Sequence, residues 1–279
     1  MKIFDRTSKR TIFLGLSQVL LVSAIGLPSL RAQTDTDFDE YKVRIDSFWF
    51  YSNPTGSFQD ATTGNIINLH KDFGFGSYST FTGKLDWKFT RKNHVYLVGA
   101  PFDQSRQAVL HRTIVFQGQT FNVGVLAKAN LSSPLIAPGY QYDIIRRRRG
   151  HLGLAVQFNL FNSNASLFAA AQVNTNNQVI SAKKSLLVPI PVAGPQFRFY
   201  LTNSPRLFVE GNLYGMYFFG YGNFVSTADN IGVTLNKHLS LNAGYQLGSR
   251  LNVKVDSKKD RLGLSLTQKG PIVGAEVSF

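Results

Sequence analysis

The chain ends in Gly270-Pro-Ile-Val-Gly-Ala-Glu-Val-Ser-Phe279, and this stretch decides the fold that the sequence predicts. Its odd-numbered residues from Val273 to Phe279 are apolar, whereas its even-numbered residues from Gly274 to Ser278 are small or polar. This period of two predicts a β-strand with one apolar and one polar face. The ends of soluble chains usually fray, but the last strand of a transmembrane barrel pairs with its first strand. We therefore expect a barrel-closing strand, with Phe279 as an aromatic anchor at the membrane boundary.

The composition agrees with a membrane barrel. Charged residues make up 16% of the 279 positions, below the roughly 25% of soluble proteins. The mean hydropathy is nevertheless only -0.07, because the apolar residues are spread along the chain, as they are in barrel strands. A soluble all-β protein is the alternative that composition leaves open. The absence of cysteine excludes disulfides, zinc–thiolate sites, cysteine nucleophiles and acylation at a cysteine.

Residues 1–32 have the features of a cleaved signal peptide. Basic residues between Lys2 and Arg10 precede an apolar run from Ile12 to Leu27, and Ala32 supplies a small residue at the cleavage position. The run is short of the ~20 residues that cross a bilayer as a helix, and an uncleaved inner-membrane anchor is the alternative. Cleavage would leave residues 33–40 as a short, flexible periplasmic tail and residues 41–279 as the barrel.

Alternating segments along the rest of the chain predict ten antiparallel strands in an up-and-down barrel, although eight or twelve strands remain compatible with the pattern. The expected strands cover residues 41–52, 78–90, 94–102, a segment ending at 140–146, 151–160, 190–202, 207–219, 223–235, 239–255 and 261–279. Short polar turns at 91–93, 146–150, 203–206 and 236–238 alternate with long connections, among them 53–77 and 162–188. This asymmetry is typical of outer-membrane barrels, whose short turns are periplasmic. In the last strand the apolar positions change from even to odd, and we expect a bulge near Gly270-Pro271.

Alternation alone does not say which face is inside. Aromatic residues near strand ends, such as Tyr41, Tyr51, Trp87 and Phe89, suit the girdles of a membrane protein. We therefore expect the apolar faces to contact lipid and the polar faces to line the lumen. A soluble sandwich would instead pack Trp87 and other large aromatics together inside.

Three segments resemble a known group of proteins. These are Ile67-Asn-Leu69, Asp72-Phe-Gly-Phe75, and Gly270-Pro271 followed by the terminal Phe279. Together with the strand pattern, they resemble the small outer-membrane β-barrels of Gram-negative bacteria, including a group with no established activity. The resemblance implies location in the cell outer membrane and recognition of the C-terminal aromatic residue by the barrel assembly machinery. It supplies no reaction.

Charged residues on the polar faces predict a salt-bridged network in the lumen. The expected members are Lys42, Arg44, Asp46, Lys84, Asp86, Lys88, Asp143, Arg198 and Glu210. Because ten strands enclose little more than side chains and buried charges require partners, we expect a closed lumen. The function that follows is structural or surface interaction, and the alternative is a narrow porin-like passive transporter of small solutes.

The other candidate features concern partners and catalysis. A basic cluster on the last hairpin is expected to contact lipopolysaccharide phosphates; its members are Arg250, Lys254, Lys258, Lys259 and Arg261. Cleavage of the signal peptide would remove five basic residues and one acidic residue, which lowers the net charge from +14 to +10. Because an exported protein rarely meets nucleic acid, we expect anionic lipid head groups and lipopolysaccharide as the partners of this basic chain. The five histidines lack metal-ligand spacing, so we expect no metal, no cofactor and no enzymatic activity. A lipid hydrolase using His70 or His111 is the less favoured alternative, and we expect a monomer.

Overall fold

The computed structural model describes residues 37–60, 65–173, 176–218, 222–256 and 261–279. The predicted signal peptide and residues 33–36 lie outside this range. The elements are β1 (Val43–Ser52), β2 (Thr55–Asp60), β3 (Ile66–Asn68), α2 (Leu69–Phe73), β4 (Tyr78–Lys88), β5 (Asn93–Ala100), β6 (Asp103–Val109), β7 (Ile114–Phe116), β8 (Gln119–Phe121), β9 (Leu126–Ser132), β10 (Leu135–Arg147), β11 (Gly150–Val173), β12 (Asn176–Tyr200), β13 (Arg206–Phe218), β14 (Gly222–Thr234), β15 (Leu239–Asp256) and β16 (Arg261–Ser278). Among the described residues, no helix has the length and apolar character needed to cross a bilayer.

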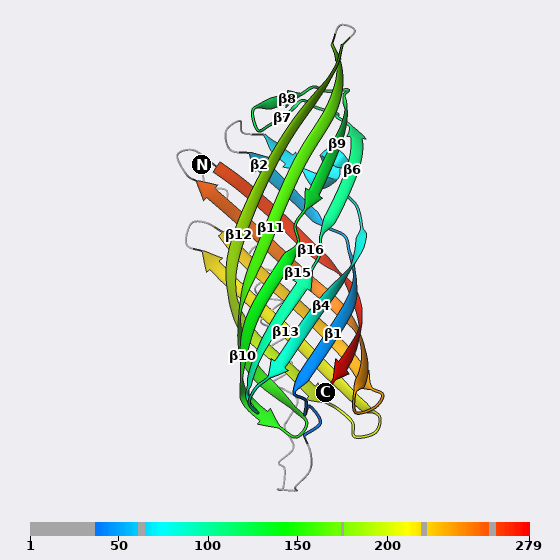
Figure 1. Ribbon diagram of the computed structural model, residues 1–279, viewed down its shortest axis with the longest axis vertical. Coiled ribbons are helices and arrows are strands. Elements are labelled where there is room, and N and C mark those ends of the chain that lie inside the picture. Colours follow the sequence, from blue (N-terminus) through cyan, green and yellow to red (C-terminus); the bar gives the residue numbers. More distant parts are fainter. Residues whose placement is uncertain (1–36, 61–64, 174–175, 219–221, 257–260) are drawn as a thin grey trace.

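In the described part of the chain, ten strands form a closed antiparallel barrel (Figure 1). Their order is β1-β4-β5-β10-β11-β12-β13-β14-β15-β16, and β16 pairs with β1 to close the ring. The final residue completes this seam, because Phe279 N donates to Val43 O (2.8 Å) and Lys42 N donates to Phe279 O (2.6 Å). The ten strands and the closing role of the C-terminal strand are therefore confirmed.

The apolar strand faces point outward. Trp87 and Phe158 keep 50% and 52% of their surface exposed, and Phe199 stacks on Phe197 along the same outer face of β12. Large exposed apolar side chains on a closed barrel require lipid around them. The soluble sandwich is thereby excluded.

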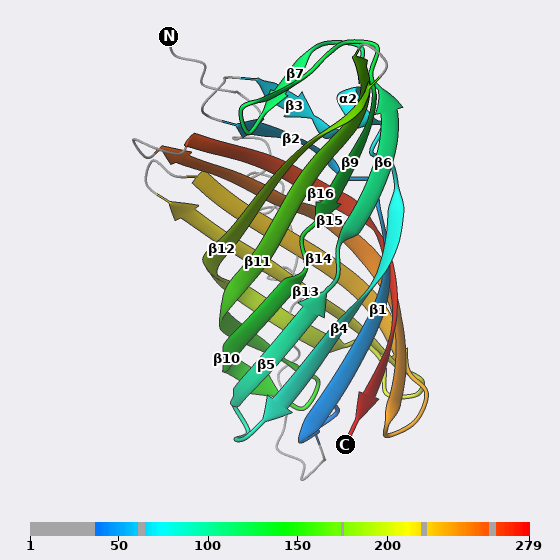
Figure 2. The same cartoon turned by 45° about the horizontal axis from the view of Figure 1, so that its top comes forward.

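The two ends of the barrel differ, as Figures 1 and 2 show. One end, here called the turn end, carries the short connections after β4, β10, β12 and β14 and the C-terminus. The other end, the cap end, carries β2, β3, α2, β6, β7, β8 and β9 together with the long hairpin of β11 and β12 (Figure 2). By the rule that short turns are periplasmic, the cap is the extracellular end.

Residues 162–188 correct the prediction of a long irregular connection. They continue β11 and β12 as one hairpin, paired from Gly150–Phe199 to Val173–Asn176. The prediction failed because the inner face of this extension is made of small or apolar residues that pack on the cap, which gives weak alternation. The apolar segment Ile114–Phe116, in the connection between β6 and β9, forms β7, which pairs with β8 in a separate two-stranded sheet and does not extend a barrel strand.

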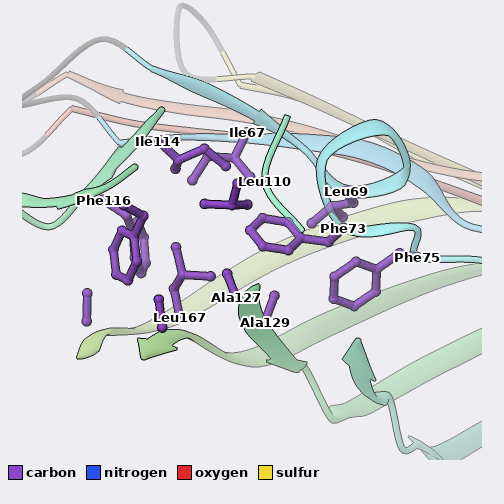
Figure 3. Close-up of a cluster of buried hydrophobic side chains, with 13 residues drawn as sticks. Ile67, Leu69, Phe73, Phe75, Leu110, Ile114, Phe116, Ala127, Ala129 and Leu167 are labelled. Carbon is purple, nitrogen blue, oxygen red and sulfur yellow. The ribbon is translucent and has the colours of Figure 1, made fainter. Parts of the chain in front are cut away.

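The cap has its own apolar core (Figure 3). Phe73 and Phe75 follow one another on α2 and its C-terminal turn, where Gly74 adopts a left-handed φ of 66°. Asn68 caps the start of α2 by accepting from Lys71 N at 2.9 Å. These rings pack with Ile114 and Leu167, among others, so the cap is a folded layer and not a set of solvated loops.

The phase change in the last strand has another cause than the one expected. Between β15 and β16 the register shifts from Gln246–Gly270 to Ser249–Gln268, so the extra residue lies in β15 and not at Gly270-Pro271. From Leu264 onward the even-numbered residues of β16 face inward: Ile272 and Glu276 are buried, and Leu264 packs against luminal apolar residues. Leu264 and Leu266 therefore belong to an apolar upper part of the lumen, whereas apolar strand positions were expected to contact lipid.

Candidate functional site in the barrel lumen

The N-terminal tail, residues 37–40, lies in the mouth of the barrel at the turn end. Phe38 N donates to Arg148 O at 2.9 Å, and the Phe38 ring meets Tyr200 edge-on and lies beneath the guanidinium of Arg206. Residues 37–40 were expected to be a flexible tail, but these contacts insert them into the barrel mouth. The tail is held there because its carboxylates pair with cations of the barrel wall, Asp37 with Arg146 and Asp39 with Arg44.

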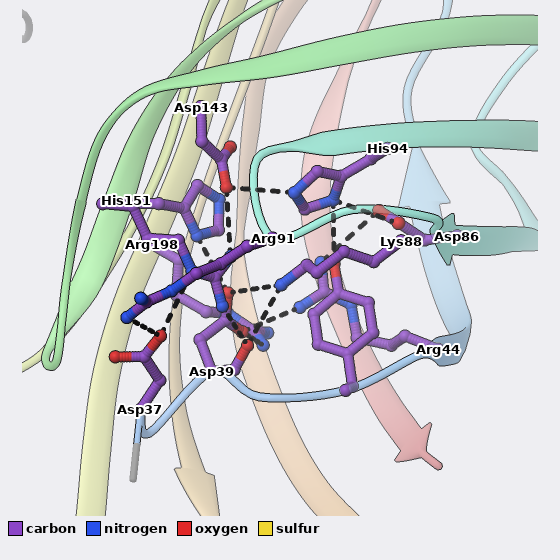
Figure 4. A network of polar contacts seen from close by, with 12 residues as sticks. Asp37, Asp39, Arg44, Asp86, Lys88, Arg91, His94, Asp143, His151 and Arg198 are labelled. Atoms are coloured by element: carbon purple, nitrogen blue, oxygen red, sulfur yellow. Dashed lines mark hydrogen bonds and ion pairs between the residues drawn. The ribbon is translucent and has the colours of Figure 1, made fainter. Parts of the chain in front are cut away.

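Asp39 is the centre of the ion pairs that hold the tail in the barrel mouth (Figure 4). Its carboxylate lies 3.3 Å from Arg44, 3.5 Å from Lys88, 2.9 Å from His151 and 3.6 Å from Arg198. Burial alone would raise the pKa of Asp39, but Lys88, the hydrogen bond with His151 and Arg44 hold that pKa well below its usual range. The tail therefore carries a fixed negative charge into a ring of cations.

A second part of the network surrounds His94 on β5. Its ring nitrogens lie 3.2 Å from Asp86 and 3.0 Å from Asp143, and Tyr41 Oη lies 3.1 Å from Nδ1. Arg146 adds ion pairs to Asp143 (3.2 Å) and to Asp37 (3.3 Å). The imidazole thus joins strands β4, β5 and β10, and Arg146 connects this part of the network to the tail.

The third part crosses the lumen. Arg198 on β12 forms a bidentate ion pair with Glu276 on β16 and lies 2.8 Å from Glu210 on β13. In the barrel order β12 and β16 are four strands apart, so this pair is a bridge through the interior. Such paired guanidinium–carboxylate contacts are the strong form of buried ion pair.

We call these residues the floor network. Its members are Asp37, Asp39, Tyr41, Arg44, Asp46, Lys84, Asp86, Lys88, His94, Asp143, Arg146, His151, Arg198, Glu210 and Glu276. Eight of the nine expected charges therefore lie together in the floor network.

Lys42, the ninth expected charge, lies outside the floor network, because it is exposed and precedes the first residue of β1. The alternation of inward and outward side chains holds only within a strand. Just before β1 the buried ring of Tyr41 occupies the interior, and Arg44 and Lys88 lie over it.

Sequence reasoning missed four important members of the floor network. Glu276 and His151 lie at inward positions of their strands, and the alternation that placed Arg198 inside would have found them. His94 directly follows the short polar turn at 91–93, where a solvated ring would be expected, but it is buried. Asp39 gave no signal, because it precedes the first strand and only its tertiary contacts show its role.

An open chamber lies above the floor network. It is a cavity of about 260 Å³, with Arg44, Asp46, Lys84 and Glu210 at its base. Its walls combine apolar residues such as Phe224 and Leu251 with neutral polar ones. The neutral polar residues include Gln157, Gln196, Tyr214 and Ser226. Leu266, near its top, also packs against the apolar core of the cap.

The remaining candidate residues lie outside this chamber. His70 contacts the carbonyl of Phe75 through Nδ1 at 2.8 Å, and His111 is exposed. In the part of the chain that the structure describes, no group of three His, Asp or Glu residues is placed to hold a metal ion.

The basic cluster is only partly described. Lys258 and Lys259 lie outside the described residues, whereas Arg250 and Lys254 belong to β15 and Arg261 to β16, toward the cap end of those strands.

Comparison with known proteins identifies the fold. No protein-family model matches the chain, and no curated protein matches it either. Among solved structures, the outer-membrane protease OmpT from Escherichia coli superimposes with a TM-score of 0.51 at 11% identity, covering 87% of this chain and 100% of that one. The transport unit of the autotransporter AIDA-I from Escherichia coli has a TM-score of 0.44 at 10% identity, covering 94% of this chain and 97% of that one. The toluene transporter TodX from P. putida has a TM-score of 0.37 at 10% identity, covering 87% of this chain and 91% of that one.

These similarities concern architecture alone. A closed antiparallel barrel with a lipid-facing apolar belt is the fold of bacterial outer-membrane proteins. The chain is thus an outer-membrane β-barrel, located in the cell outer membrane, with a buried salt-bridge network at its periplasmic end.

Proposed function

We propose that this outer-membrane barrel is closed and acts through its extracellular cap, in a structural or surface-interaction role without enzymatic activity. The observation that carries the proposal is the bridge from Arg198 to Glu276 with Asp39 beside it, because it fills the lumen at the floor network. A water-filled pore would require these charges to stand apart along the wall. The folded cap agrees with this role, since it presents a fixed surface above the membrane.

The expected partners follow from location. The outer surface of the belt contacts lipid, and the basic cluster around Arg250 is proposed to meet lipopolysaccharide phosphates near the cap end. No nucleic acid is expected there. We propose that the chain is monomeric, since its strand edges are paired around the ring.

The second candidate is a narrow passive transporter, and the chamber of about 260 Å³ is the observation that favours it. Transport would require the floor network to open, because the chamber ends on Arg44 and Asp46. Opening would separate buried partners, which costs about 3–5 kcal/mol for each charge left unpaired. The closed barrel is therefore the better supported function.

Single-channel recording in planar bilayers tests the choice. The unmodified barrel should show no steady conductance steps, and Arg44→Ala should introduce them by removing a guanidinium that fills the floor network. Ile45→Ala is the matched control, because the neighbouring Ile45 side chain faces lipid and is 48% exposed. Steady steps from the unmodified barrel, enlarged by Arg44→Ala or Asp46→Ala, would instead establish the transporter.

A further inference from the structure

The chamber above the floor network differs from the lumen expected of an outer-membrane barrel. Barrel interiors are usually polar, but here a cluster of apolar side chains is buried inside the ring. Those that line the chamber include Phe224 and Leu251, with the partly buried Val98 and Phe161 packed against the same cluster. They come from four different strands, so the apolar character belongs to the wall as a whole and not to one misplaced residue.

Neutral polar groups are interleaved with this apolar wall. Gln157 Nε2 donates to Asn159 Oδ1, and Tyr214 Oη donates to Gln196 Oε1 at 3.0 Å. Each of these groups keeps further hydrogen-bonding capacity, since an amide has two donors and two acceptor lone pairs. A largely apolar pocket with a few polar groups that fix orientation is the usual composition of a small-molecule site.

The charges at the base of the chamber already neutralise one another. Arg44 pairs with Asp46 at 3.7 Å, and Lys84 pairs with Asp86 at 3.3 Å. Glu210 is held by Arg198 at 2.8 Å. A charged ligand would have to break one of these pairs or remain uncompensated in a buried site, so the chamber selects against ions.

The size of the chamber sets the size of its occupant. Its volume of about 260 Å³ equals that of roughly nine water molecules at ~30 Å³ each. The occupant is therefore on the order of ten non-hydrogen atoms, which corresponds to a substituted monocyclic or a small bicyclic molecule.

From these observations we propose that the chamber binds one small, uncharged amphiphile, with a flat apolar body against the Phe224 and Leu251 side and a hydroxyl or amide group toward Gln157 and Gln196. The floor network forms the base of the site, and Leu266 near its top packs against the apolar core of the cap. The barrel is then a receptor for such molecules at the cell surface. This deepens the proposed function, because a closed floor is what allows a ligand to be retained.

Equilibrium dialysis with 2-naphthol tests the proposal. The probe is neutral at neutral pH, has one hydroxyl and is close to the chamber in size. The full mature chain in lipid nanodiscs should take up one 2-naphthol per barrel, saturably, above the uptake of empty nanodiscs. Naphthalene-2-sulfonate, which has the same rings and a fixed charge, should bind at least about tenfold more weakly.

Two neighbouring positions on β14 supply a matched pair of variants. Ser226 lines the chamber, whereas Thr227 lies on the opposite, outer face of the same strand. Ser226→Trp should fill the chamber and weaken 2-naphthol binding about tenfold or more, and Thr227→Trp should leave it within about twofold. Thr82→Phe, on β4 across the chamber, repeats the test if Ser226→Trp does not fold.

Three outcomes would overturn the site: uptake that never saturates, equal binding of the neutral and anionic probes, or equal losses in Ser226→Trp and Thr227→Trp. None of these depends on conductance. A barrel that conducts but binds 2-naphthol saturably would contradict the closed floor alone, whereas a silent barrel that takes up no probe would contradict the site alone.

Discussion

The side-chain hydroxyls of Tyr96 on β5 and Tyr214 on β13 lie 3.3 Å apart across the barrel interior. Four strand steps separate β5 from β13 in the ring, so this hydrogen bond is a second bridge, above that of Arg198 and Glu276. Lys84 Nζ lies 4.9 Å from the centre of the Tyr96 ring, which connects the bridge to the floor network. Side-chain bridges therefore cross the lumen at two levels.

Tyr214→Phe should destabilise the barrel by about 1 kcal/mol. The change removes a hydroxyl that contacts both Tyr96 and Gln196 but keeps the ring that packs in the upper lumen. Urea unfolding in detergent micelles measures the effect. Tyr245→Phe is the control, since Tyr245 faces outward on β15 and is 41% exposed; equal losses for the two variants would show that the bridge contributes nothing specific.

Asp39→Asn should lower the unfolding free energy more than Tyr214→Phe does, by about 3 kcal/mol or above at neutral pH. The change leaves several buried cations without the carboxylate that they share. Glu40→Gln, at the exposed neighbouring position, should have little effect. The comparison is made by urea unfolding of the folded barrel in micelles. A loss for Asp39→Asn no larger than that for Glu40→Gln would mean that the tail merely occupies the mouth without holding it closed.

The unmodified protein and Asp39→Asn should also differ in how their stability depends on pH. The pKa of Asp39 is lower in the folded state than in the unfolded chain, whose value is about 3.9. A carboxylate with a depressed folded pKa contributes stability that is fully present above the unfolded pKa and is lost as pH falls through the folded pKa. The difference in unfolding free energy between the unmodified protein and Asp39→Asn should stay constant from neutral pH to about pH 5 and shrink below about pH 4. A difference that already falls between pH 7 and 5 would contradict this assignment.

The success and failure of sequence prediction have a common physical reason. Strand alternation is a local property, and it located the ten strands, the turns at 91–93 and 236–238, and inward charges such as Arg198. The role of Asp39 depends on contacts with four other segments, which no local pattern encodes. The apolar chamber was missed because lipid and an apolar lumen impose the same period on a strand. Leu264 faces inward because β16 alternates without interruption from Leu264 to Glu276, where a bulge at Gly270-Pro271 was expected.

The cap is held together in part by the ion pair between Arg112 and Asp72, here called the clasp, and Arg112→Lys should weaken this ion pair. Arg112 binds the Asp72 carboxylate through two nitrogens, at 2.9 Å and 2.7 Å. The hydrogen bond from Arg112, together with that from Asn68 N, lowers the pKa of Asp72 despite its partial burial. A lysine has one ammonium group and cannot reproduce the two-pronged contact. Since the pair is partly exposed, we expect a loss of only about 0.5 kcal/mol.

Limited proteolysis measures this clasp better than global unfolding does. Cleavage of the cap segment between β6 and β9 should accelerate a few-fold in Arg112→Lys, while the barrel strands stay protected. Arg106→Lys is the control, because Arg106 contacts only the neighbouring carbonyl of Ser105 among its described hydrogen bonds. Unchanged cap cleavage in Arg112→Lys would show that the apolar core of the cap holds it without the clasp.

Phe279→Ala should reduce the fraction of chains assembled in the outer membrane several-fold and change the stability of the folded barrel much less. The Phe279 ring is 64% exposed and contacts His238 at 6.0 Å between ring centres, whereas its backbone makes the closing hydrogen bonds with Lys42 and Val43. Alanine keeps that backbone pairing, so a large assembly defect would have to come from recognition of the aromatic side chain during biogenesis. Val277→Ala, two residues earlier on the same outer face, is the matched control, and membrane fractionation with unfolding of the recovered barrel separates the two effects. If both variants assembled equally well, the exposed ring would serve only as a boundary anchor at the membrane surface.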